Sequence, residues 1–190
     1  MKRRQCRKIV SAAVLLLLSA CATAPHEGAR LPWAATNGFD FLNAVVEANN
    51  YQAAAGGLAM KKSPSPDVRA FGRMIWLDSL DSNSQLRWLA NASATSDGSN
   101  PGPGIVLPYK VSTHYMFVID ELVPVSGEAF DQRFIAQQSD ALKESLMLAQ
   151  VFSRSGDDLE LKEFAKRSVP KIQKQLDTIT EIEMRHNAKG

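Results

Sequence analysis

Apolar residues recur every three to four positions along four long segments of the chain, and this spacing predicts four amphipathic α-helices. The four segments cover about residues 39–62, 66–89, 127–152 and 159–182. Ser65 and Asp158 stand just before two of these segments, where side chains that cap a helix N-terminus are preferred. Pro66, at the first position of the second segment, is also typical of a helix start. We therefore expect four separate helices, each with one apolar face to bury.

The connections between these segments differ in length, which limits the ways in which the helices can be joined. The first and third connections are short turns, whereas about thirty residues separate the second segment from the third. Within this stretch, residues 96–108 are rich in Gly, Pro, Ser and Asn, and residues 109–122 have the spacing of one short helix. One long connection between the second and third helices is the connectivity of ferritin-like bundles. The sequence therefore predicts an all-α, ferritin-like four-helix bundle whose crossover contains a short helix.

The apolar stripe of the second helix is interrupted at its centre by Asp78, Ser79 and Ser82. Three interpretations are open. The polar residues form a functional site in the core, or a polar patch satisfied by neighbouring helices, or the buried face shifts to Trp76 and Leu80. The stripe of the third helix also carries polar residues at its centre. Both helices thus place polar groups where an apolar core is expected.

The first twenty residues have the pattern of a secretory signal peptide. Five basic residues and no acidic residue precede an apolar run that is about half as long as a membrane-spanning helix requires. Residues 18–21, Leu-Ser-Ala-Cys, resemble the lipobox of bacterial lipoproteins, in which the cysteine carries a lipid. We therefore expect cleavage before Cys21 and attachment of acyl chains such as palmitate to Cys21. The alternative is an ordinary signal peptide with an incidental cysteine.

The resemblance to lipoproteins also implies a location and a domain organisation. Residue 22 is Ala rather than the Asp that retains lipoproteins in the inner membrane of Gram-negative bacteria. The expected location is thus the outer membrane, with the chain anchored by its lipid and facing the periplasm. Residues 1–20 are then the signal peptide, residues 21–38 the lipidated cysteine and a flexible tether, and residues 39–187 the four-helix domain.

Cleavage before Cys21 reverses the net charge of the chain. The full chain has 22 Lys and Arg against 20 Asp and Glu, and loss of the five basic residues of the signal peptide leaves 17 against 20, a net charge of about −3. This charge and the expected compartment exclude nucleic acid as a partner. The mature chain keeps Cys21 alone, which is lipidated, so that neither a disulfide nor a cysteine metal site is expected.

Four stretches, in order and with matching gaps, resemble a family of ferritin-like outer membrane proteins grouped as domain of unknown function 4142. The stretches are residues 57–59, 68–75, 127–135 and 156–170. The third, Gly-Glu-Ala-Phe-Asp-Gln-Arg-Phe-Ile, is similar to the family signature G-x-x-F-D-x-x-Y-[ILV], and the fourth includes the helix proline, Pro170. The resemblance covers about residues 39–182 and implies the same helical bundle.

The family resemblance also implies where a site lies. Members carry a glutamate on the first helix and histidines on the other three, which face the bundle interior and suggest a metal site. The aligned positions here are Gln52, Ser79, Leu142 and Gln175, with Asp78 retained next to Ser79. Glutamine binds divalent metals weakly and leucine cannot bind them. We therefore expect no metal centre of the family type and no other cofactor.

Other residues offer only weak candidates for a rebuilt metal site. Di-iron bundles use two Glu-x-x-His motifs, and this chain has one, from Glu183 to His186, near its C-terminal end. The weak candidates that remain are Asp78, Glu183 and His186. The sequence has no nucleophile elbow, zinc-protease motif or Walker loop, so we predict neither a catalytic residue nor an enzymatic activity.

Two functions of different classes follow from these patterns. The first is a lipid-anchored envelope protein whose bundle is a non-catalytic binding or structural module, with another envelope protein, a cell-wall polymer or a second copy of the chain as partner. The second is a ferritin-like metal-binding or redox-active protein that acts in envelope stress. A small apolar ligand between the helices is a third interpretation, because Gly56 and Gly57 form a flat surface and the helix stripes contain polar residues.

Overall fold

The computed structural model describes residues 36–93 and 106–188, which form five α-helices and, within these ranges, no strand. The helices are α1 (Gly38–Lys62), α2 (Pro66–Ser93), α3 (Thr113–Asp120), α4 (Gly127–Ser155) and α5 (Leu159–Asn187). The expected signal peptide, Cys21, most of the tether and most of the Gly- and Pro-rich loop lie outside the described residues. Within the part that is described, no helix has both the length and the apolar character needed to span a lipid bilayer.

Capping side chains mark the starts of α1 and α5, close to the positions where the sequence predicts these helices to begin. At the start of α1, the Oδ1 atom of Asn37 accepts the backbone N–H of Asp40 at 2.8 Å. At the start of α5, the Oδ1 atom of Asp158 accepts the backbone N–H of Leu161 at 2.9 Å. α4 begins at Gly127, whose φ of +64° is a conformation that glycine adopts without strain. These long helices therefore begin where local chemistry favours a helix start.

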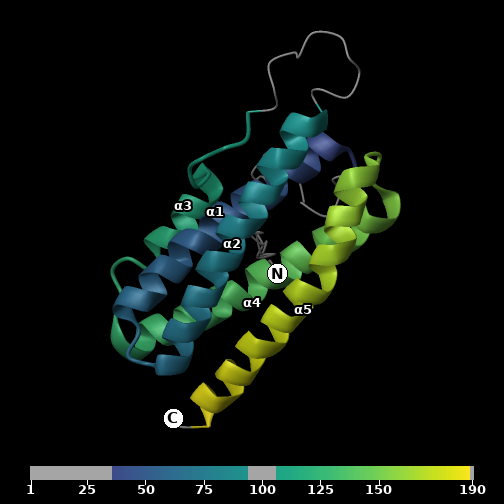
Figure 1. Cartoon of the computed structure of the whole chain (residues 1–190). Coiled ribbons are helices and arrows are strands. Elements are labelled where there is room, and N and C mark those ends of the chain that lie inside the picture. Colours follow the sequence, from purple (N-terminus) through teal and green to yellow (C-terminus); the bar gives the residue numbers. More distant parts are fainter. Residues whose placement is uncertain (1–35, 94–105, 189–190) are drawn as a thin grey trace, which may run out of the picture.

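α1 with α2 and α4 with α5 form two helical hairpins (Figure 1). The N–H of Gly38 donates to Asp157 Oδ1 at 2.8 Å, which joins the start of α1 to the turn between α4 and α5. Lys62, at the end of α1, donates to the carbonyl of Leu122, just before α4, at 3.2 Å. α1 therefore runs antiparallel to α4, and α2 and α4 run in the same direction (Figure 1). This connectivity confirms the predicted ferritin-like bundle.

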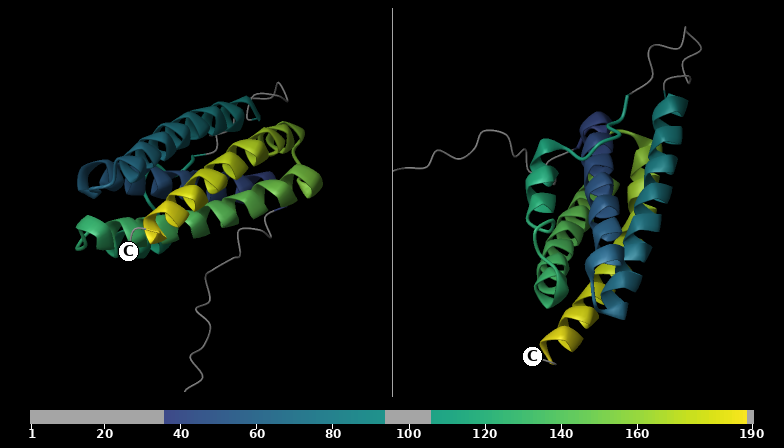
Figure 2. Two further views of the ribbon diagram at one scale, coloured as in Figure 1. Left: turned by 90° about the horizontal axis from the view of Figure 1, so that it is seen from below. Right: turned by 90° about the vertical axis from the view of Figure 1, so that its left-hand side faces the viewer.

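α3 is the short helix of the crossover and lies against α1, on the side away from α2 (Figure 2). It spans Thr113–Asp120, which is shorter than the stretch of 109–122 predicted from apolar spacing. The helix stops at Asp120 because Glu121 and Leu122 turn the chain, and the N–H of Leu122 donates to the carbonyl of Ile119 at 2.8 Å. The short helix predicted in the crossover is thus present and shorter by a few residues at each end.

Two apolar clusters fill the bundle, and a polar layer separates them. One cluster lies toward the turn between α1 and α2 and includes Phe71, Phe130 and Phe134. The other lies toward the turn between α4 and α5 and includes Phe41 and Phe152, whose rings stack with their centroids 3.9 Å apart. The polar layer contains residues from the interrupted stripes, namely Asn49, Gln52, Ser79, Ser82 and Gln175.

α1 and α2 approach each other closely at two glycines. A Cβ atom on Gly56 would overlap the backbone carbonyl of Gly72, and a Cβ atom on Gly72 would lie 2.7 Å from the Cβ of Ala59. A Cβ atom on Gly57, by contrast, would meet no atom within 4 Å. Of the flat surface predicted at Gly56 and Gly57, only Gly56 therefore faces a neighbouring helix.

Candidate functional site

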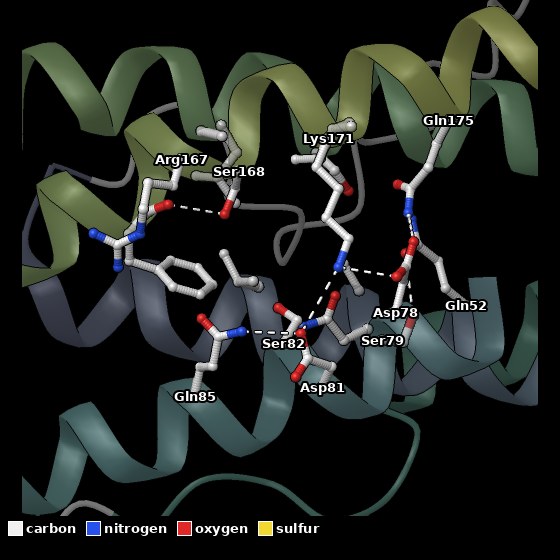
Figure 3. Close-up of a pocket in the computed structure, with 18 of the residues that line it drawn as sticks. Gln52, Asp78, Ser79, Asp81, Ser82, Gln85, Arg167, Ser168, Lys171 and Gln175 are labelled. Carbon is white, nitrogen blue, oxygen red and sulfur yellow. Dashed lines mark hydrogen bonds and ion pairs between the residues drawn. The ribbon is translucent and has the colours of Figure 1, made fainter. Parts of the chain in front are cut away.

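A cavity of about 290 Å³ lies in the polar layer, between α1, α2, α4 and α5 (Figure 3). Its apolar lining comes mainly from Phe41 and Val45 of α1, Leu148 of α4 and Phe164 of α5. The exposed lining residues all belong to α2 and α5, so the cavity opens between these two helices. They are Asp81, Gln85, Arg167 and Lys171. Its volume lies near the lower end of the range of about 300–1,000 Å³ that is usual for small-molecule sites.

The polar centre of α2 forms one wall of the cavity and is bonded to neighbouring helices. The Oδ2 atom of Asp78 accepts a hydrogen bond from Gln175 of α5 at 2.6 Å. The hydroxyl of Ser79 donates to the Oε1 atom of Gln52 of α1 at 3.4 Å. Ser82 accepts a hydrogen bond from Asn49 of α1 at 2.9 Å. The polar stripe is thus a patch satisfied by two neighbouring helices, as the second interpretation predicts, and it also borders the cavity.

The third interpretation, a buried face that shifts to Trp76 and Leu80, is wrong. Trp76 is 37 % exposed and Leu80 is 44 % exposed, whereas Ser79 is buried. The physical reason is that hydrogen bonds from α1 and α5 offset the cost of burying the α2 hydroxyl and carboxylate. The helix therefore keeps its polar residues inside the bundle and turns these two large apolar side chains toward solvent.

Residues of α5 spaced three or four positions apart form the opposite wall. Arg167, Lys171 and Gln175 follow one another at intervals of four residues, so they lie on one face and span about 12 Å along the helix axis. The Nζ atom of Lys171 lies 2.9 Å from Asp78 Oδ1 and 3.8 Å from Asp81 Oδ2. This ion pair crosses the opening of the cavity between α2 and α5 (Figure 3).

Arg167 lines the same opening without such a partner. Its guanidinium is exposed, and no ion pair joins it to another residue within 36–93 or 106–188. The carboxylates at the opening are engaged elsewhere, because Asp78 contacts Lys171 and Gln175 while Asp81 accepts a hydrogen bond from Gln85 at 2.9 Å. The opening thus combines carboxylates that already have partners with a guanidinium that has no ion pair in the part of the chain that the structure describes.

The structure brings together most of the positions that the family resemblance indicates. Gln52, Ser79 and Gln175 all line the cavity, together with Asp78. Leu142 does not, because it is fully buried in the apolar cluster toward the α1–α2 turn. The bundle interior at these positions thus offers amides, a hydroxyl and one carboxylate already paired with a lysine. Such a donor set does not fit the metal centre that the family resemblance suggests.

The weak metal candidates are not brought together. His186 lies in the last turns of α5, with its Nε2 atom 3.8 Å from Glu128 Oε1, whereas Asp78 pairs with Lys171 about four turns earlier along α5. Glu183 is exposed. No group of three or more His, Cys, Asp or Glu side chains could hold a metal ion in the described part of the chain. The two carboxylates Asp140 and Glu144 are also exposed and face solvent.

A second buried polar group, outside the cavity, centres on Tyr51. Its hydroxyl accepts a hydrogen bond from Gln138 Nε2 at 3.2 Å, and its ring stacks on Tyr115 with a centroid separation of 4.8 Å. Burial raises the pKa of Tyr51 well above its ordinary value of 10. Burial, followed by the charges of Glu144 and Glu47, raises the pKa of Tyr115 to about 12. Both phenols therefore stay neutral up to a higher pH than a solvent-exposed tyrosine does.

The sequence analysis missed Arg167 and Lys171. Their spacing relative to Gln175 could have placed them on the same face of α5, but charged residues at helical spacing are usually solvated. The partners that distinguish them are distant in sequence, since Asp78 lies 93 positions before Lys171. Only the packing of α2 beside α5 reveals that the two residues line a cavity.

The comparisons with known proteins agree with this fold. Residues 23–182 match the family described as "Domain of unknown function (DUF4142)". Two solved structures with a similar fold are "CopM in the Cu(II)-bound form", with a TM-score of 0.61, and "CopM in the Cu(I)-bound form", with a TM-score of 0.59. Each is 13 % identical; the matches cover 78 % and 77 % of this chain, and 97 % and 95 % of those chains. A comparison with curated proteins found no match. At this identity the likeness to the solved structures shows the helical fold alone.

Proposed function

We propose that this chain, which belongs to the DUF4142 family, is a non-catalytic ligand-binding module of the bacterial cell envelope. The function of the family is unknown, so the proposal rests on the site of this chain itself. The observation that carries the proposal is the cavity of about 290 Å³ between α2 and α5. It coincides with the interior positions Gln52, Ser79 and Gln175. The ligand is a small molecule with an apolar body.

The lining supports an apolar ligand body with a few polar contacts. Phe41, Leu148 and Phe164 offer apolar surface, while Gln52 and Gln175 offer amides whose principal hydrogen bonds are already made to Ser79 and Asp78. Small-molecule sites typically combine a mainly apolar lining with a few polar groups that orient the ligand. Because the polar wall is self-satisfied, the free energy of binding comes mainly from burial of apolar surface.

The envelope location rests on the N-terminal sequence. The basic start, the short apolar run and the Leu-Ser-Ala-Cys stretch support export and lipidation at Cys21. Two or three acyl chains hold a protein durably at a membrane, whereas one chain does not. The module would then be anchored in the outer membrane and face the periplasm. Metabolic labelling with radioactive palmitate should mark the wild-type chain and not the Cys21→Ser variant, and an unlabelled wild-type chain would contradict the lipid anchor.

Binding in the cavity can be tested with the neutral fluorescent probe N-phenyl-1-naphthylamine and the mature domain, residues 22–190. Two variants, Ala48→Phe and Ser145→Phe, place a ring in the cavity from α1 and from α4. The matched control is Ala136→Phe, at an exposed position of α4. We expect saturable binding to the wild type and to the control, and affinity at least ten-fold lower in the two filled variants.

Two results would contradict this proposal. One is the absence of saturable probe binding to the wild-type domain. The other is unchanged affinity in both filled variants, provided that circular dichroism and thermal melts show them to be folded. Loss of binding in the control as well would mean that the probe binds the surface of α4 rather than the cavity.

Metal binding is the second candidate function, because the two similar structures are described by their titles as copper-bound forms of CopM. In the described part of this chain, however, the cavity offers two carboxylates, Asp78 and Asp81, and both already contact Lys171. Elemental analysis of residues 22–190, purified from the periplasm without chelator or histidine tag, tests this candidate directly. Near-stoichiometric copper, iron, manganese or zinc that is lost in Asp78→Ala or Glu183→Ala would favour the metal function over the ligand-binding module.

A further inference from the structure

We infer that the ligand of this cavity is an amphipathic anion, with one negatively charged group held by Arg167 at the opening between α2 and α5. The inference rests on the proposed function, because it specifies the chemical class of ligand that the same cavity takes. The shared chemistry is an apolar body that carries a carboxylate, sulfonate or phosphate at one end.

The charges at the opening favour an anion over a cation. Asp78 and Asp81 both contact Lys171, so a cationic ligand would have to displace that lysine from its ion pairs. Arg167 has no ion pair among the described residues, so an anion needs to displace nothing. The formal charge of these four side chains is zero, but within the described part of the chain the guanidinium is the one group among them that has no ion pair. A guanidinium can also bind a carboxylate, sulfonate or phosphate through two parallel hydrogen bonds.

The two ends of the cavity differ, which orients the ligand. At one end, Gln175 and Asp78 are joined by a hydrogen bond of 2.6 Å and need no further partner. Arg167 lies two helical turns, about 12 Å, from Gln175 along α5, and Phe164 lies one turn before it. The ring of Phe164 meets that of Phe41 edge to face, with centroids 6.5 Å apart. The Arg167 guanidinium therefore lies at the aromatic end of the cavity, where an apolar body and an anionic group can be bound together.

Two fluorescent probes separate the contribution of the charge from that of the apolar body. N-phenyl-1-naphthylamine and 8-anilinonaphthalene-1-sulfonate share one ring skeleton, and only the second carries a sulfonate. Binding of each is measured to the wild-type domain and to Arg167→Gln. The matched control is Lys174→Gln, which removes one positive charge from an exposed position of α5 that does not line the cavity.

We expect Arg167→Gln to weaken binding of the sulfonate probe about five-fold, as is usual for a partly exposed ion pair, and to change binding of the neutral probe by less than two-fold. Lys174→Gln should leave both affinities within two-fold of the wild type. Arg167→Lys should retain most of the sulfonate affinity because it keeps the charge. Raising the salt concentration should reduce the difference between wild type and Arg167→Gln, because salt screens an exposed pair.

The outcomes separate this inference from the proposed function. If neither probe binds, the proposed function fails and the inference fails with it. If the neutral probe binds in the cavity but Arg167→Gln changes both affinities equally, or changes neither, the cavity binds ligands and the inference of an anion is overturned. Displacement of the sulfonate probe by decanoate would indicate that the ligand is a lipid-derived acid. Displacement by 1-naphthoate would indicate an aromatic acid. Either result supports the inference.

Discussion

Gly56 and Gly57 are neighbours on α1, yet a methyl group added to each should change stability in opposite directions. A Cβ atom on Gly56 overlaps the backbone carbonyl of Gly72, whereas a Cβ atom on Gly57 meets no atom within 4 Å. Both substitutions to Ala gain helix propensity, which is worth about 0.5–1 kcal/mol. Gly57→Ala should therefore raise the free energy of unfolding by about that amount.

Gly56→Ala must also move two helices apart. Overpacking usually costs about 1–3 kcal/mol, and a cost near the upper end is expected here because the contacted atom belongs to the backbone and cannot rotate away. The net effect should be a loss of about 1–2 kcal/mol. Gln52 lies one turn before Gly56 and accepts a hydrogen bond from Ser79 at 3.4 Å, so a wider spacing should also weaken probe binding in the cavity.

The assay is urea unfolding of residues 22–190, followed by circular dichroism at 222 nm, for the wild type, Gly56→Ala and Gly57→Ala. The two variants differ by one position and by the same methyl group, so propensity cancels and the difference reports the contact with Gly72. The expected difference between the two variants is about 2–3 kcal/mol. Equal stability of the two variants would refute the claim that Gly56 and Gly72 determine the spacing of α1 and α2.

Three further predictions concern pH, the ion pair and the core. Burial raises the pKa of Tyr115 to about 12 from its ordinary value of 10. The stability that the buried, neutral phenol contributes is therefore complete below pH 10. It is lost between pH 10 and pH 12, because the unfolded chain releases the phenol proton first. Relative to Tyr115→Phe, the free energy of unfolding of the wild type should fall by about 2–3 kcal/mol between pH 10 and pH 12. Parallel curves of unfolding free energy against pH for the two proteins would contradict the raised pKa of Tyr115. Asp78→Ala removes the partner of Gln175 and the nearer of the two carboxylates at Lys171, and should cost about 1–3 kcal/mol in urea unfolding. A neutral effect would show that the bonded network adds no stability. Leu142→Ala should lower the free energy of unfolding by about 2–5 kcal/mol, because Leu142 is fully buried. It should leave probe affinity unchanged, because Leu142 does not line the cavity. A loss of probe binding in the folded variant would place Leu142 in the site instead.

The candidate site was only partly readable from the sequence. Gln52, Ser79 and Gln175 were marked as interior positions by the family resemblance, and all three line the cavity. Arg167 and Lys171 were not marked, because on the sequence they resemble ordinary solvated residues of a helix face. Whether a charged side chain lines a site depends on the side chains that face it, and here these side chains lie on another helix, α2.

The number, order and approximate ends of the helices, and the ferritin-like connectivity, could all be predicted from the sequence. These features depend on local physics, namely apolar spacing of 3.6 residues, capping side chains and the lengths of the connections. The tertiary structure alone decided that Ser79 is buried while Trp76 is exposed, that Gly56 rather than Gly57 packs against α2, and that Asp78 meets Gln175. Each of these depends on how a helix is rotated about its axis, which is set by contacts such as that between Asp78 and Gln175, 97 positions apart in the chain.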